Sequence, residues 1–241
     1  MRWEILLLAL VSGYLFGSIP VSRLISRFFS HGKKTEDIEV KVPDTDEVYK
    51  VSSKGAAAAS MNLGARAGCT IGLLDMLKVA LPTLIFRLVF NNPDYFLAAA
   101  ITGMIGHNWP VFNNFKGGRG VSSVYGALFV IDWIGAFSVA AAGLIIGLLV
   151  FRDFIIAYVA GIFLIIPWLW FRFHDWWYLV FAILLNILFI VAMIPDLKQY
   201  LYFKRKGKAD MDVVMSTTPM GRGMQKMMDK MGLSKKKKNN N

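Results

Sequence analysis

The sequence predicts an all-α polytopic membrane protein with about seven transmembrane helices. Hydrophobic residues make up 56% of the 241 residues, and the mean hydropathy is +0.49. The apolar runs are long, and a helix needs roughly 17–25 residues to cross a bilayer. The single cysteine, Cys69, and three widely separated histidines exclude an intramolecular disulfide and give no metal-ligand spacing. No metal or other cofactor is therefore expected.

Seven apolar segments follow one another, and each is expected to be helical. They run over Trp3–Ser26, Arg66–Phe90, Tyr95–Phe112, Val121–Ile131, Ile134–Phe151, Phe154–Phe171 and Trp176–Ile194. The fourth is too short to span alone, so it is either a half-helix or merges with the fifth through Asp132–Trp133. Met1–Leu24 lacks a small-residue cleavage site and is followed by further spans, which predicts that it stays as the first transmembrane helix.

The basic residues predict the orientation. They gather after the first and third segments and beyond Pro195, whereas the loops after the second and sixth segments, NNPD and RFHD, are nearly neutral. Basic residues that flank spans tend to stay in the cytoplasm. With seven crossings, the N-terminus is expected outside and the C-terminus in the cytoplasm.

The chain is predicted to consist of an integral membrane domain, residues 1–200, that contains one cytoplasmic insertion, and of a tail, residues 201–241. In DIEVKVPDTDEVYKVSS, apolar and charged residues alternate on both sides of a proline-aspartate turn, which predicts a cytoplasmic β-hairpin-like insertion near residues 36–53. It is interpreted as a lid or as an insertion without chemical role. Residues 201–241 form a basic, Met-rich cytoplasmic tail, either a solvated end or a segment that binds anionic lipid headgroups. The tail lacks the aromatic-basic platform of a nucleic-acid-binding protein.

Residues 106–123 read GHNWPVFNNFKGGRGVSS and contain the strongest candidate for a binding site. Glycines accept positive φ, and consecutive N–H groups in such a turn can converge on an anion. A helix that starts near Val121 would direct its positive dipole end to the same point. The five residues Lys116, Gly117, Gly118, Arg119 and Gly120 are therefore predicted to bind a phosphate or carboxylate. The alternative is a tight turn whose cations only set the topology.

Three further polar residues are candidates for the same site. His107 ends the helix before the loop, where it can hydrogen-bond the loop or donate to a phosphate oxygen. Asp75 and Lys78 stand three residues apart inside an apolar run, a spacing that permits an ion pair on one helix face. Charges in such a run face a polar cavity or each other. They are thus interpreted as a structural pair or as contacts to a substrate.

The motif GHNWPVFNNFKGGRGV strongly resembles GHxxPVFxxFxGGKGVA of the PlsY family, the bacterial acyl-phosphate:glycerol-3-phosphate acyltransferases. The stretches GYLFGSIPVSRLI and LGARAGCTIGLLDMLKVALP resemble two further family segments, and the likeness runs roughly from Glu4 to Lys198. It implies a seven-helix enzyme of the cell (inner) membrane. Such an enzyme transfers the acyl chain of acyl phosphate to the 1-hydroxyl of glycerol 3-phosphate, which gives lysophosphatidic acid for phospholipid synthesis. The partners are then these two substrates and membrane lipids, and the glycine-rich loop would bind phosphate.

The first family motif, SGNxGATNxxR, is altered in this chain. VSSKGAAAASM stands in its place, so Ser52 and Ser53 are the candidates for the catalytic serine. Met61 occupies the arginine position, and Arg66 is the next guanidinium, a possible substrate contact. Because this motif could line the acceptor site, two alternatives stay open. One is the same fold with a different acceptor, and the other is a non-catalytic anion-binding membrane protein.

Two single positions also depart from the family pattern. Arg119 replaces the lysine of GGKG, which keeps the charge and allows bidentate phosphate binding. Asp196 stands where the third motif, HRxNIxRLLxGxE, has its asparagine. The histidine and the glutamate of that motif are absent.

Overall fold

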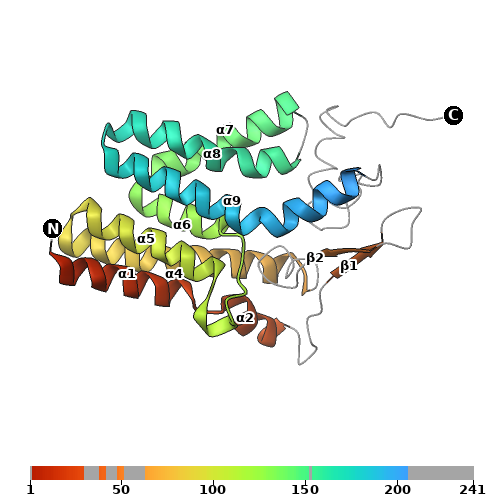
Figure 1. Cartoon of the computed structure of the whole chain (residues 1–241), viewed down its shortest axis with the longest axis horizontal. Helices are drawn as coiled ribbons and strands as arrows, with labels where there is room; N and C mark the ends of the chain where they lie inside the picture. Colours follow the sequence, from red (N-terminus) through yellow and green to blue (C-terminus); the bar gives the residue numbers. More distant parts are fainter. Residues whose placement is uncertain (1, 30–37, 42–47, 52–62, 152–153, 206–241) are drawn as a thin grey trace.

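Apolar helices pack side by side along most of the chain, with their axes roughly parallel to the long axis of the molecule (Figure 1). The computed structural model describes residues 2–29, 38–41, 48–51, 63–151 and 154–205. The α-helices are α1 (Trp3–Gly17), α2 (Val21–Phe29), α4 (Ala65–Phe90), α5 (Pro93–Asn108), α6 (Val121–Ile131), α7 (Trp133–Ile145), α8 (Phe154–Phe173) and α9 (Trp176–Arg205). A short 3-10 helix, η1 (Val111–Asn113), follows α5, and a π-helical segment, η2 (Ile146–Phe151), follows α7.

The first apolar segment is broken, so the prediction of one helix over Trp3–Ser26 is wrong. Helix α1 ends at Gly17 and α2 begins at Val21. Pro20 has no backbone N–H to donate, and its ring disfavours a helical conformation at the residue before it. The break leaves the carbonyl of Ile19 outside the helix, where it accepts a hydrogen bond of 3.1 Å from the Lys78 ammonium of α4.

Helices α1 and α5 touch along their backbones. A Cβ placed on Gly13 would collide with the carbonyl of Ala99, and one on Gly17 would collide with the backbone of Gly103. Small residues allow this close approach, which is the usual basis of helix association in membranes. The seam formed by Gly13, Gly17, Ala99 and Gly103 holds the end of α1 against the end of α5, next to the candidate site.

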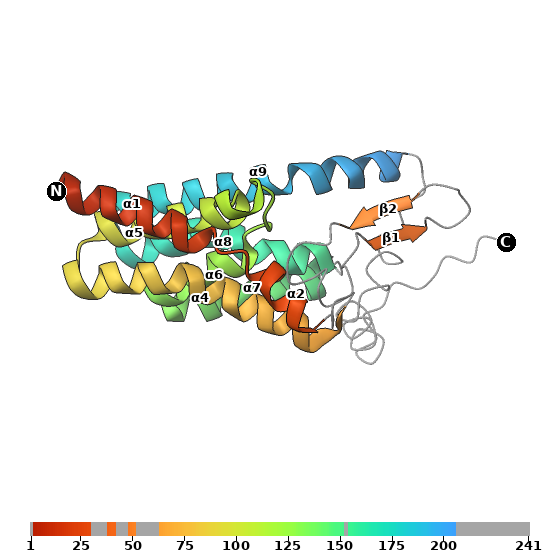
Figure 2. The ribbon, with the colours of Figure 1, turned by 90° about the horizontal axis from the view of Figure 1, so that it is seen from below.

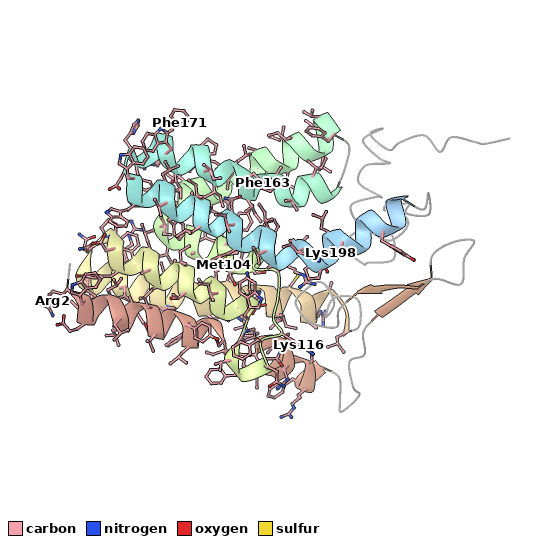
Figure 3. The ribbon with its side chains drawn as sticks, in the orientation of Figure 1. Arg2, Met104, Lys116, Phe163, Phe171 and Lys198 are labelled. Atoms are coloured by element: carbon pink, nitrogen blue, oxygen red, sulfur yellow. The ribbon has the colours of Figure 1, made fainter. Side chains whose placement is uncertain are left out.

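The described residues carry the signature of a membrane protein. Three stretches among them are long and apolar enough to cross a bilayer: Trp3–Phe28, Trp133–Phe151 and Trp176–Lys198. Large apolar side chains are exposed on all the described α-helices except α5, which a soluble monomer avoids. Fully buried side chains form the core, and Met104 of α5 is one of them (Figure 3). The count of seven spans and the orientation stay predictions.

Two predicted boundaries are resolved by backbone conformation. Asp132 is extended, with φ −154°, so α6 and α7 are separate helices and do not merge. Helix α5 ends at Asn108 and not at Phe112, because Trp109 precedes Pro110 and leaves the helical region with φ −130° and ψ 68°. The chain therefore turns four residues earlier than the hydropathy pattern predicts.

A two-stranded antiparallel sheet lies inside the segment for which the sequence predicts a hairpin. Strands β1 (Ile38–Lys41) and β2 (Val48–Val51) pair from Ile38 opposite Val51 to Lys41 opposite Val48. The pair lies at the end of the molecule that holds α2 and the C-terminal end of α9 (Figure 2). The division into a membrane domain, an insertion and a tail stays a prediction, and residues 206–241 lie outside the described residues.

Candidate active site

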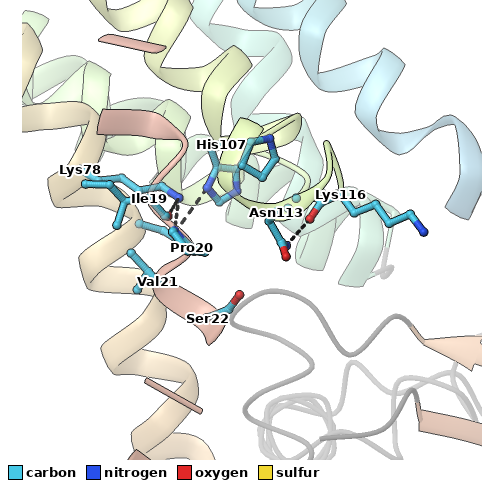
Figure 4. Close-up of a pocket in the computed structure, with 12 residues that line it drawn as sticks. Ile19, Pro20, Val21, Ser22, Lys78, His107, Asn113 and Lys116 are labelled. Carbon is cyan, nitrogen blue, oxygen red and sulfur yellow. Dashed lines mark hydrogen bonds and ion pairs between the residues drawn. The ribbon is translucent and has the colours of Figure 1, made fainter. Parts of the chain in front are cut away.

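A pocket opens where the break after α1 meets α4 and the loop that follows α5 (Figure 4). Its lining comprises residues 19–22, Asp75, Lys78, His107, Pro110, Asn113 and residues 116–118. Three segments that are far apart in the sequence thus meet here: residues 19–22, residues 75–78 and residues 107–118. Six of the residues that the sequence singles out belong to the lining: Asp75, Lys78, His107, Lys116, Gly117 and Gly118.

A buried carboxylate is the centre of the pocket's charge. Oδ1 of Asp75 lies 2.9 Å from Nζ of Lys78 and 3.4 Å from Nδ1 of His107. All three side chains are less than a tenth exposed. The ion pair expected from the spacing of Asp75 and Lys78 is present, and because both residues also line the pocket, contact with a substrate stays a prediction. Buried charges of this kind are retained in pairs because removing one partner is costly.

The loop after α5 is held against the pocket by its own hydrogen bonds. The N–H of Gly118 donates to the carbonyl of His107 over 3.2 Å. The amide of Asn113 donates to the carbonyl of Lys116 over 2.6 Å. Asn114 and Phe115 have φ 51° and 56°, so two non-glycine residues make the left-handed turn before the glycines. The backbone of the loop is therefore fixed at both ends of the glycine pair.

The glycines serve two different physical purposes. Gly120 has φ +87° and caps α6, which begins at Val121 as predicted. Gly117 and Gly118 are not in the positive-φ region that glycine accepts. They leave room instead: a Cβ on Gly117 would collide with the carbonyl of His107, and one on Gly118 would collide with Nε2 of the imidazole. The Nε2 edge of His107 therefore faces the loop.

The cations of the predicted phosphate set are placed unequally. Lys116 is exposed, and its side chain points away from His107 and Lys78 (Figure 4). Arg119 does not line the pocket, because its guanidinium is bound to the carboxylate of Asp196 on α9. Arg66 is exposed in the first turn of α4 and is not part of the lining either.

Ser52 and Ser53, the candidates for the catalytic serine, lie outside the described residues. Sequence reasoning missed Arg23 and Asn113. The guanidinium of Arg23 on α2 donates to Oδ1 of Asn113, which is itself buried beneath the loop. Arg23 could have been found from its position, because it is a cation three residues after Pro20, the proline that breaks the first segment. The sequence contains no comparable signal for Asn113.

Comparison with known proteins identifies the family. The family model described as glycerol-3-phosphate acyltransferase matches residues 7–202. The chain belongs to this family. Two solved structures of PlsY (YgiH), an integral membrane glycerol 3-phosphate acyltransferase, in the lysophosphatidic acid form and the glycerol 3-phosphate form, match with TM-scores of 0.64 and 0.65. Their identities are 23% and 24%, and the matches cover 81% of this chain and 91% and 92% of the two solved chains. The fold is that of an integral membrane protein of this family.

The share of a relative's length that this chain matches differs from one relative to another. The glycerol-3-phosphate acyltransferase of Prochlorococcus marinus (strain NATL2A) is 32% identical over 127 residues, which are 53% of this chain and 58% of the relative. That of Rubrobacter xylanophilus is 35% identical over 50% of this chain and 53% of the relative. This chain therefore spans little more than half the length of these two relatives. Glycerol-3-phosphate acyltransferase 2 of Moorella thermoacetica is 30% identical over 199 residues, 81% of this chain and 93% of the relative.

Proposed function

We propose that this protein transfers an acyl chain from acyl phosphate to the 1-hydroxyl of glycerol 3-phosphate and so forms lysophosphatidic acid in the cell (inner) membrane. Family membership over residues 7–202 supports the reaction class. The observation that carries the proposal is the pocket, in which a buried Asp75–Lys78–His107 cluster faces the backbone of a glycine-rich loop. The cations Lys78 and Lys116 and the N–H of Gly117, beside a histidine, suit two phosphate-bearing substrates.

The chemistry requires little covalent work from the protein. Acyl phosphate is already activated, and inorganic phosphate is a good leaving group. The attacking group is the substrate hydroxyl, so no covalent enzyme intermediate is needed. Holding the two substrates together can supply up to about 7–11 kcal/mol in favourable cases. Positive charge and N–H groups that face the reacting atoms stabilise the charge that develops on the carbonyl and phosphate oxygens.

His107 is proposed as the group that accepts the hydroxyl proton. Nδ1 of the ring lies on the side of the Asp75 carboxylate, and Nε2 faces Gly118. A carboxylate on one ring nitrogen orients the imidazole and favours Nδ1–H, which leaves Nε2 as the acceptor. The substrate phosphate can serve as base where His107 does not. The variant His107→Gln, which keeps a hydrogen-bonding side chain but cannot take the proton, separates these two routes.

The phosphates are proposed to bind to Lys78, Lys116 and the loop backbone at residues 116–118. The long stem of Lys116 lets its ammonium swing to a ligand, since lysine is a flexible point charge. Arg66, Ser52 and Ser53 remain proposed contacts from the family resemblance.

The pocket is proposed to face the cytoplasm, with seven spans and the N-terminus outside. Lys116 and Lys198 lie in one half of the bundle, and Arg2 and Phe171 lie at the opposite end (Figure 3). A membrane-impermeant maleimide applied to Cys69→Ser/Lys198→Cys tests this orientation. Labelling is expected in inside-out vesicles and not in right-side-out vesicles, and the reverse pattern would refute it. The basic tail is proposed to bind anionic headgroups on the same side.

The decisive test supplies acyl phosphate and labelled glycerol 3-phosphate to the purified protein in detergent or lipid cubic phase. Labelled lysophosphatidic acid is the expected product, and His107→Gln is expected to lower kcat more than it changes KM. Phosphate release only with other acceptors would show that the acceptor has changed. The absence of turnover with every acceptor would leave a non-catalytic anion-binding protein.

A further inference from the structure

The loop of the pocket is tied to α9 by an ion pair. Nε of Arg119 donates to Oδ2 of Asp196 over 2.5 Å, and Nη2 donates to Oδ1 over 2.6 Å. The two residues are 77 positions apart in the sequence. Both oxygens of the carboxylate and two nitrogens of the guanidinium are engaged, which is the bidentate arrangement that gives the strongest arginine–carboxylate bonds.

This geometry gives Arg119 a task other than ligand binding. Its side chain is about one third exposed and that of Asp196 slightly more, so the pair lies at the edge of the loop and not inside the pocket. The pocket is lined by the loop residues on the other side of Gly118, including Lys116. A phosphate could bind the guanidinium of Arg119 in this way only by displacing the Asp196 carboxylate, which already accepts its two hydrogen bonds.

Both partners also stand at positions where this sequence departs from the motifs that it resembles. Arg119 stands at a lysine position and Asp196 at an asparagine position. A lysine ammonium offers no planar fork, and an asparagine carries no charge, so that pair of residues could not make the same bond. The two departures are thus the two halves of one interaction.

We infer that Arg119 is a positioning residue that acts through Asp196. The pair clamps the glycine-rich loop to α9 and so fixes the loop backbone, from which Lys116 extends, beside His107. Substrate phosphate is then bound by the loop backbone and by the lysines. The expected effect of the clamp on catalysis rests on the proposed function. The clamp itself does not, because it concerns only how the loop is held.

The test combines a readout of the loop with a readout of activity. Trypsin cleavage at the Lys116–Gly117 bond, quantified by mass spectrometry in detergent, reports how often the loop leaves its place. Asp196→Asn, Arg119→Ala and their combination are compared with wild type and with the charge exchange Arg119→Asp/Asp196→Arg. The control Asp94→Asn removes one negative charge from the first turn of α5, at the opposite end of the bundle.

If the pair is a clamp, Asp196→Asn and Arg119→Ala each speed this cleavage about fivefold, the size expected of a partly exposed bidentate pair. The combination is no faster than either, the charge exchange recovers part of the protection, and Asp94→Asn behaves as wild type. In the acyl-transfer assay, the two single variants lower kcat by similar factors, and the combination lowers it no further.

Two results would overturn the inference. One is that Arg119→Ala raises the KM for glycerol 3-phosphate tenfold or more while Asp196→Asn leaves it unchanged or lowers it, because Arg119 would then be a phosphate ligand. The other is cleavage that is equally slow in all variants. If wild type shows no acyl transfer, the proposed function fails, and the cleavage rates still decide whether the clamp exists.

Discussion

The buried carboxylate of Asp75 offers the sharpest test of how the pocket is held together. Asp75→Asn changes few atoms but removes the negative charge that faces both Lys78 and His107. The Lys78 ammonium keeps its bond of 3.1 Å to the carbonyl of Ile19 and loses its ion pair of 2.9 Å. Because Lys78 is less than a tenth exposed, water can replace the lost partner only in part.

The cost follows from this burial. Removing one partner of a buried ion pair typically lowers the free energy of unfolding by about 3–5 kcal/mol. For a domain of 150–250 residues, about 1 kcal/mol shifts the Tm by roughly 2–4 °C. Asp75→Asn is therefore expected to lower the Tm by roughly 6–20 °C. The double variant Asp75→Asn/Lys78→Met removes both charges and keeps the volume of the lysine stem, so it is expected to recover most of this loss.

The assay is thermal unfolding in one fixed detergent, followed by intrinsic tryptophan fluorescence. Asp94→Asn is the matched control, because Asp94 is a partly exposed carboxylate in the first turn of α5. Its loss is expected to cost no more than about 1 kcal/mol through the helix dipole. The reasoning is refuted if Asp75→Asn melts within 2 °C of wild type, or if the double variant is less stable than both single variants.

Three further substitutions test separate parts of the structure. Gly118→Ala places a Cβ against the imidazole of His107. It is expected to lower kcat by about 10²-fold, since misplacing a catalytic group by about 1 Å costs that much. An unchanged kcat in steady-state assays would show that the loop shifts to accommodate the Cβ. Lys116→Ala is expected to raise the KM for glycerol 3-phosphate about tenfold or more, because it removes a charge-assisted hydrogen bond to the phosphate. An unaltered KM would show that Lys116 does not bind the phosphate. Trp168→Phe deletes the indole N–H that donates to buried Asp132 over 2.8 Å and is expected to cost about 1–3 kcal/mol in thermal unfolding. Its KM is expected to stay at the wild-type value because Asp132 lies at the far end of α6, so a changed KM would contradict the separation of the two ends.

Local rules predicted the parts of the site that are local in the sequence. The spacing of Asp75 and Lys78 predicted their ion pair, because residues three apart share one face of a helix. The glycines before Val121 predicted the start of α6. The end of α5 was placed four residues too late, because the apolar pattern continues past Pro110 to Phe112.

What the sequence could not predict depends on tertiary packing. Hydropathy does not distinguish a kinked span from a broken one, so Pro20 was absorbed into a single first helix. The bond between Arg119 and Asp196 joins residues 77 positions apart, and no periodicity connects them. Arg23 was interpreted only as a determinant of topology, because its partner Asn113 lies 90 positions away.

The glycine seam between α1 and α5 has a thermodynamic consequence. Association through Gly13, Gly17 and Gly103 freezes almost no side-chain rotamers, so forming the seam costs little conformational entropy. Its attraction is van der Waals contact, which does not need water to be expelled. The seam is therefore expected to hold over a wide range of temperature and lipid composition. It fixes the end of α1 relative to the end of α5, which carries His107.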